Sequence, residues 1–138
     1  MDVSTTAPFV ARLAAIAAAA GFVLVAAFQI ALAFGAPWGR GAWGGAHDVL
    51  PTRLRIASSV GAVTLILGAL VVLGRAGYWG SAIPSGVFRW GAWALVGAMA
   101  LSAFGNFASS SRWERLFMGP MALLLALLCL VVALNSHL

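Results

Sequence analysis

The sequence predicts an all-α integral membrane protein with four transmembrane helices in an up-down bundle and an interfacial first loop rich in glycine and tryptophan. Hydrophobic residues make up 63% of the 138 positions and charged residues 8%, whereas an ordinary soluble domain has about 45–50% and about 25%. Mean hydropathy is +1.03. The apolar residues form four long runs, and nearly all charges lie between them. Because a helix needs about 20 apolar residues to cross a hydrocarbon core of about 30 Å, the chain has room for four crossings in one domain, residues 1–138.

The four runs define spans at about 12–34, 54–74, 87–105 and 113–135. The first run is longer than the apolar region of a secretory signal peptide, which has about 7–15 residues, so we expect it to be a helix of the bundle. The polar groups deep in the spans are one amide and several hydroxyls, namely Gln29, Ser58, Ser59, Thr64 and Ser102. No span has an ionisable residue in its middle, where a proton-coupled transporter needs one. Coupled transport is therefore disfavoured.

Gln29 is the most costly of these polar groups to leave unpaired among lipid tails. We expect it to meet another span. Packing between helices is the simpler role, and contact with a pore or a ligand is the alternative.

The start of the fourth span carries two local signals. The segment 111–114, Ser-Arg-Trp-Glu, fits the capping box, in which the serine caps the helix and the glutamate reaches back to the serine's backbone N–H. An arginine on a neighbouring loop is the alternative partner for Glu114. Pro120 lacks the N–H that would bond to the carbonyl four residues earlier, so we expect a kink or a looser first turn there.

Small residues at helical spacing predict a packing face on the third span. Ala94, Ala98 and Ser102 lead to Asn106 along one side of the helix. Such a side lets a second helix approach closely, so we expect it to pack inside the bundle.

With four spans, the first and third connections share one side of the membrane, and both termini share the other side with the second connection. The first side then carries five arginines and the second side three. Because arginine-rich connections stay in the cytoplasm, we predict that both termini lie outside. The small margin leaves dual insertion, and an antiparallel homodimer built from it, open as alternatives.

The basic residues are all arginines, and they give a net charge of +5. They flank the apolar spans, where they meet lipid phosphates and guide insertion. Membrane lipids are therefore the expected partners, and nucleic acid is not. A homo-oligomer is a further expectation.

The first and third connections form a face of the protein that we call the loop face. The first connection, about 35–55, is rich in glycine, and its tryptophans favour the headgroup level of a membrane. Two spans begin at this face and present free backbone N–H groups, which together with arginines suit an anion such as a lipid phosphate. The alternative is a solvated rim in which Asp48 or Glu114 pairs with an arginine. The candidate ligand-binding residues are Trp38, Trp43, His47, Asp48, Arg53, Arg55, Asn106, Ser109, Ser111, Glu114 and Arg115.

The same residues carry a resemblance to a known group of proteins. The pattern joins Pro-Trp-Gly, Trp-Gly-Gly, Leu-Pro and an arginine in the first connection to an Asn, two Ser, Glu-Arg and Pro further on; these are 37–39, 43–45, 50–51, Arg55, Asn106, Ser109, Ser111, 114–115 and Pro120. It resembles a family of uncharacterised small four-span bacterial integral membrane proteins. The resemblance covers nearly the whole chain and implies a bacterial cytoplasmic (inner) membrane, without assigning an activity.

The sequence has no motif for catalysis, metal binding or cofactor binding. His47 and His137 fall on opposite sides of the predicted membrane and cannot share a metal, and Cys129 has no second cysteine to pair with. Enzymatic activity is therefore disfavoured, and no catalytic residue, metal or cofactor is assigned.

Two functional hypotheses follow. The first is a small binding or structural membrane protein that holds a lipid, a small apolar molecule or a partner subunit at the loop face. The second is an oligomeric channel or transporter for a small solute or anion. The lack of charge at membrane depth favours the first.

Overall fold

The computed structural model describes residues 3–135, and in that part of the chain every long element is a helix. The long helices are α1 (Val3–Ala33), α2 (Thr52–Arg75), α3 (Ser85–Phe107) and α4 (Gly119–Asn135). Three short helical segments complete the order: η1 (Gly39–Gly41), η2 (Trp43–Gly45) and η3 (Glu114–Met118). His137 lies outside the described residues.

Four stretches are long and apolar enough to cross a membrane: Thr6–Ala33, Thr52–Arg75, Ser85–Phe107 and Glu114–Asn135. They correspond to the four spans expected from the sequence. The ends agree within two residues except at the start of α1, where the helix extends nine residues further toward the N-terminus than expected. The helix content and the four candidate spans indicate a multi-pass membrane protein.

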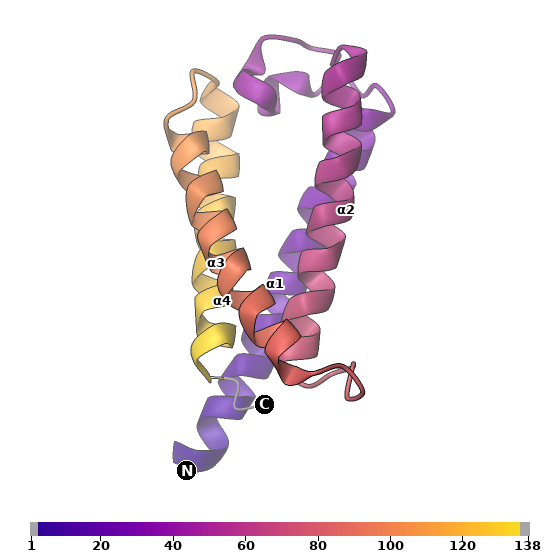
Figure 1. Ribbon diagram of the computed structural model, residues 1–138. Helices are drawn as coiled ribbons and strands as arrows, with labels where there is room; N and C mark the ends of the chain where they lie inside the picture. The colour runs from indigo at the N-terminus through magenta and orange to yellow at the C-terminus, as the bar shows by residue number, and fades with distance from the viewer. Residues whose placement is uncertain (1–2, 136–138) are drawn as a thin grey trace.

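The helices are arranged as two hairpins. In Figure 1, α1 lies beside α2 and α3 lies beside α4, and contacts of α1 with α4 join the pairs. The hairpins lie close together near the start of α1 and apart at the end where the first and third connections lie. The short helices η1 and η2 of the first connection extend across that wider end toward the α3–α4 pair.

The main apolar core lies where α1, α2 and α4 meet. Phe22, Val72, Leu125 and Cys129 are among its fully or almost fully buried members. A Cβ on Gly21 would lie only 2.8 Å from Leu125 Cδ2, so glycine at this position lets α1 and α4 approach closely. This core holds the two hairpins together at the end where they lie close to each other.

Arg55 and Gly35 define the end of α1. Gly35 has φ +93°, and the N–H groups of Gly35 and Ala36 donate to the carbonyls of Leu32 and Ala31, both at 3.0 Å. This is the Schellman arrangement, in which a residue in the left-handed region ends the helix. Arg55 Nε donates to the carbonyl of Ala33 at 2.7 Å, which places a positive charge at the negative end of the helix dipole.

The fourth span begins with the π-helix η3. The N–H of Gly119 donates to the carbonyl of Glu114, five residues earlier. Pro120 has no N–H to continue the ordinary ladder, and a π turn is one way to absorb that loss. The expected irregularity at the start of this span is confirmed.

The small-residue stripe on α3 does not pack as expected. Ala94 and Ala98 are exposed, and the buried residues of α3 are Phe88, Ala92 and Ala103, on another side of the helix. Only Ser102 and Asn106, at the end of the stripe, face the interior. The spacing showed which residues share a side but not which side meets another helix.

Candidate functional site

The first connection is held against the third by three hydrogen bonds. The N–H of Gly44 donates to Oε1 of Glu114 at 3.1 Å, and the hydroxyl of Ser110 donates to the carbonyl of Gly44 at 3.3 Å. The hydroxyl of Ser111 donates to the carbonyl of Arg40 at 2.5 Å. These contacts join the two hairpins at the wide end of the molecule, on the loop face.

Trp43 sits at the centre of this contact in a strained conformation. Its φ is +54°, the only positive φ of a non-glycine residue in the described chain, and Gly44 and Gly45 follow at +82° and +73°. A bulky residue in the left-handed region costs about 1–3 kcal/mol and persists only when its surroundings fix it. The indole Nε1 donates to Oγ of Ser58 at 2.9 Å, and Ser58 is 0% exposed on α2.

Glu114 does not complete the predicted capping box. Ser111 Oγ accepts the N–H of Glu114 at 3.3 Å, which is the serine half of the motif. The glutamate half is absent: the N–H of Ser111 donates instead to Oγ of Ser109 at 3.0 Å. The Glu114 carboxylate accepts hydrogen bonds from Gly44 and, very closely, from the hydroxyl of Ser109. It is 7% exposed and forms no ion pair with an arginine within residues 3–135.

A cavity of about 250 Å³ lies between the hairpins beneath Trp43. Its walls come from α1, α2, α3, η3 and α4, and Gly41, Ala42 and Trp43 of the first connection cover its end. The apolar part is lined by Val25, Phe28, Leu65, Met99, Met118, Met121, Ala122 and Leu125. The polar part is lined by Gln29, Trp43, Ser102, Asn106 and Glu114.

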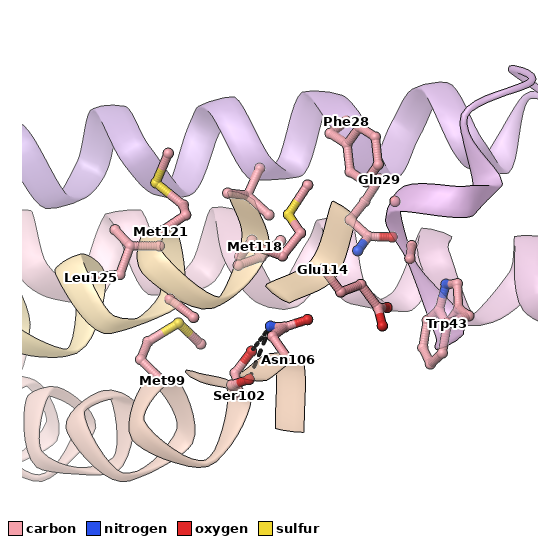
Figure 2. Close-up of a pocket in the computed structure, with 15 residues that line it drawn as sticks. Phe28, Gln29, Trp43, Met99, Ser102, Asn106, Glu114, Met118, Met121 and Leu125 are labelled. Atoms are coloured by element: carbon pink, nitrogen blue, oxygen red, sulfur yellow. Dashed lines mark hydrogen bonds between the residues drawn. The ribbon is translucent and has the colours of Figure 1, made fainter. Parts of the chain in front are cut away.

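Figure 2 shows how the two parts are separated. Glu114, Asn106, Gln29 and Trp43 gather at the end near the loop face, and Met99, Met121 and Leu125 lie at the other end. The cavity therefore has a polar head region and an apolar body, which is the usual composition of a small-molecule site.

The polar end presents the carboxylate of Glu114 together with the amides of Gln29 and Asn106. Asn106 Nδ2 donates to the carbonyl of Ser102 at 2.9 Å and to its hydroxyl at 3.3 Å, so this donor is used within α3. The Oε1 atom of Gln29 is buried and accepts no hydrogen bond from a described residue. A buried polar atom without a partner is uncommon in proteins and calls for an explanation.

Two further hollows border the cavity. A polar cleft between the first and third connections shares Trp43, Ser102, Asn106 and Glu114 with the cavity. An apolar groove on the α1–α4 side shares Phe28, Gly41 and Met118 with it and is also lined by exposed aromatic residues, namely Trp38, Trp113 and Phe117. The cavity is thus bordered by the polar cleft on one side and by the apolar groove on another.

The structure divides the residues predicted for the loop face into two groups. Trp43, Asn106, Ser109 and Glu114 line the cavity or the polar cleft, and the intramembrane residues Gln29 and Ser102 join them. Ser111 lines neither the cavity nor the cleft, and its hydroxyl donates to the carbonyl of Arg40. The others lie elsewhere: Trp38 is in the apolar groove, and His47, Asp48 and Arg53 are exposed and line neither the cavity nor the cleft.

Two of the three arginines of the predicted site, Arg55 and Arg115, donate to backbone carbonyls. Arg115 donates from one guanidinium nitrogen to the carbonyls of Ser109 and Ser110, at 2.7 and 3.1 Å. Arg55 bonds to Ala33, as described above. These contacts stabilise a loop and a helix end, and they leave the cavity without a cation among the residues that line it.

Asp48 pairs with Arg40 on the exposed surface of the first connection. Arg40 Nε makes a close ion pair with Oδ1 of Asp48, and a second guanidinium nitrogen lies 3.4 Å from Oδ2. The hydrogen bond, and then the charge of Arg40, lower the pKa of the Asp48 carboxyl; the same two effects raise the pKa of Arg40. Asp48 therefore pairs with an arginine, as the alternative of an ion-paired rim expected. Glu114 forms no such pair among the described residues.

Sequence reasoning missed the apolar part of the site. Met99 of α3, Met118 of η3 and Met121 of α4 all line the cavity. Methionine fills irregular spaces and adapts to different shapes. The position of two methionines on either side of the Gly-Pro step was the only signal in the sequence that could have located this wall.

Within the described residues, no group of three or more histidine, cysteine, aspartate or glutamate side chains is placed to hold a metal ion. No protein-family model matches the chain. No curated protein and no solved structure matches it either. The family resemblance therefore depends on the residue pattern alone, and the cavity is the feature of the structure that points to a function.

Proposed function

We propose that this chain is a small binding protein of a bacterial cytoplasmic membrane, and that it holds a small, largely apolar molecule in the cavity between its two hairpins. Its four helices would cross the bilayer in an up-down bundle, with membrane lipids around them. The arginine distribution supports a cytoplasmic loop face and external termini. Dual insertion with an antiparallel homodimer is the alternative arrangement.

The cavity is the observation that carries this proposal. An engineered apolar cavity of about 150 Å³ is large enough to bind benzene, so a cavity of about 250 Å³ suits a molecule of about ten non-hydrogen atoms. Its walls are mostly apolar, and a few polar groups converge at one end to fix the orientation of a ligand. The apolar groove beside Phe28 and Met118 offers such a molecule a route from the surrounding lipid into the cavity.

The contacts of the loop face favour this ligand over a lipid phosphate. Arg55 and Arg115 already donate to backbone carbonyls. A phosphate at the start of η3 would meet the Glu114 carboxylate, and two anions at close range repel each other. These contacts therefore favour a ligand in the cavity beneath the loop face over a ligand on its outer surface.

A variant that fills the cavity tests the proposal. Ala122 is 6% exposed and lines the cavity, so Ala122→Phe would occupy the space of the ligand. Leu123 is the next residue and is 44% exposed on the outer side of α4, so Leu123→Phe is the matched control. Native mass spectrometry from lipid nanodiscs measures the small molecules that copurify and the number of copies per particle.

The proposal predicts an adduct of small mass on the wild type and on Leu123→Phe that disappears from Ala122→Phe. Equal adducts on all three proteins, or no uptake of any added apolar compound by the wild type, would contradict it. The number of copies distinguishes a monomer from a homo-oligomer in the same spectrum.

Transport is the second candidate function. The observation in its favour is that Glu114, Asn106 and Ser102 line both the cavity and the polar cleft, so a solute could enter from the loop face. Flux into liposomes that is lost on Gln29→Leu would favour a channel or transporter. Binding without flux would favour the first candidate.

A further inference from the structure

We propose that the ligand of this cavity is an amphiphile with an organic ammonium head, and that Glu114 binds that head. The inference rests on the proposed function, because it names the chemical class of the molecule that the cavity holds. It follows from the charge, the hydrogen-bonding capacity and the shape of the polar end.

Glu114 supplies a negative charge that the described protein does not balance. Its side chain is 7% exposed, and its two hydrogen-bond donors, the N–H of Gly44 and the hydroxyl of Ser109, are neutral. Arg115, the nearest arginine in sequence, points to the carbonyls of Ser109 and Ser110. A buried charge is costly unless an opposite charge accompanies it, and a bound cation would provide one.

Two amide oxygens lie at the same end of the cavity as Glu114. Gln29 Oε1 is buried without a donor, and Asn106 has used its Nδ2 on Ser102, which leaves its amide oxygen. A primary ammonium group has three donors and no acceptor. It would donate to the Glu114 carboxylate and to the Asn106 amide oxygen together, whereas a carboxylate or phosphate head would place a second anion beside Glu114.

Trp43 adds an aromatic ring at the same end of the cavity (Figure 2). Its own Nε1 donor is taken by Ser58, so the ring offers its apolar and π surface. Aromatic rings attract cations that lie near their faces. The ring is therefore compatible with an ammonium head and offers no free donor to an anionic one.

The apolar body sets the size of the tail. Met99, Met121 and Leu125 line the part of the cavity that lies away from Glu114. An eight-carbon chain with one polar atom matches the size of about ten non-hydrogen atoms derived above. The probe for the experiment is therefore n-octylamine, with n-octanol and n-octanoate as compounds of equal chain length.

The methionines provide a readout inside the cavity. Three of the four methionines in the chain line it, so protein labelled with ¹³C at the methionine methyl groups, in nanodiscs made from deuterated lipid, reports binding there and not partition into lipid. The methyl shifts are followed during titration with each probe at pH 7, where an alkyl amine is charged because its pKa is close to that of lysine, about 10.4.

We expect n-octylamine to bind about tenfold or more tightly than n-octanol, which follows from a charge-assisted hydrogen bond in a site of low dielectric. We expect n-octanoate to bind least. Because this series uses the wild-type protein, it does not depend on whether a variant folds. Glu114→Gln keeps an acceptor for Gly44 but removes the charge, and should reduce the affinity for n-octylamine to that for n-octanol.

Asp48→Asn is the matched control, since it also removes one carboxylate but at an exposed position that does not line the cavity. It should keep the preference for the amine. Two results would overturn the ammonium inference: equal affinities for the three probes, or tighter binding of n-octanoate than of n-octylamine. Either result would leave the proposed function standing. No methyl shift with any probe would overturn both.

Discussion

The N–H of Gly44 lies 3.1 Å from Oε1 of Glu114, although 70 positions separate the two residues in the chain. This hydrogen bond joins the first hairpin to the second at their open end. It also turns the Glu114 carboxylate toward the cavity instead of back toward Ser111. One contact therefore closes the loop face and forms the polar end of the candidate site.

Replacing Glu114 should loosen the first connection. In Glu114→Ala the N–H of Gly44 loses its partner, and a hydrogen bond to a charged group contributes about 1.5–3 kcal/mol. We expect the backbone amides of residues 39–45 to exchange with deuterium about tenfold or more faster, as measured by mass spectrometry in nanodiscs. Glu114→Gln retains the acceptor and should show a much smaller change. Equal exchange in the wild type and Glu114→Ala would contradict the proposed docking.

Trp43 and Ser58 should be energetically coupled. Trp43→Phe and Ser58→Ala each remove the bond from the indole to the buried hydroxyl. Because either single change breaks the same bond, the double variant should lose about 1 kcal/mol less than the sum of the two. The free energy of unfolding in mixed micelles, titrated with a denaturing detergent, gives the three values. Strict additivity would show that this bond does not hold the loop.

Gly39 should not tolerate alanine. A Cβ at this position would overlap the carbonyl oxygen of His47 and would lie 2.8 Å from that of Asp48. Both are backbone atoms, which cannot move aside as the end of a flexible side chain can. We expect a loss of about 2 kcal/mol or more in the free energy of unfolding. Gly97→Ala is the control, since a Cβ there meets nothing within 4 Å, and alanine favours a helix by up to about 1 kcal/mol. A similar effect at both positions would argue against the described fold of the first connection.

The Asp48 carboxyl should titrate below its ordinary pKa of 3.8 because Arg40 lowers its pKa. A lowered folded-state pKa stabilises the fold above the ordinary value, and this contribution is lost as the pH falls through the folded-state value. The effect should be small, because both side chains are exposed and solvent screens them. The ¹³C shift of the carboxyl measures the titration, and Arg40→Gln should raise its midpoint back to the ordinary value. An unchanged midpoint would show that the pair does not form.

The four spans could be predicted because hydropathy is a local property of the sequence. The stretches 52–75 and 85–107, for example, can be identified as candidate spans from their length and composition alone. The irregular start of the fourth span followed in the same way from Pro120, whose missing N–H acts within one turn.

The partner of Glu114 could not be predicted from its neighbours. The local motif offered the N–H of Ser111, but that N–H bonds to Ser109 and the carboxylate bonds to Gly44. The outcome depends on how a glycine-rich connection docks, and no pattern of spacing encodes that docking. The stripe at Ala94 and Ala98 was misassigned for a related reason, since spacing does not show which side of a helix has a neighbour.

A small apolar molecule in the cavity between the hairpins can be located directly by NMR. The measurement is the nuclear Overhauser effect between the protons of n-octanol and the methyl groups of Met99 and Met121, in deuterated lipid, for the wild type and Ala122→Phe. We expect strong effects at both methyl groups in the wild type and their loss in Ala122→Phe. Effects of equal strength in both proteins, or none in the wild type, would show that the cavity does not hold such a molecule.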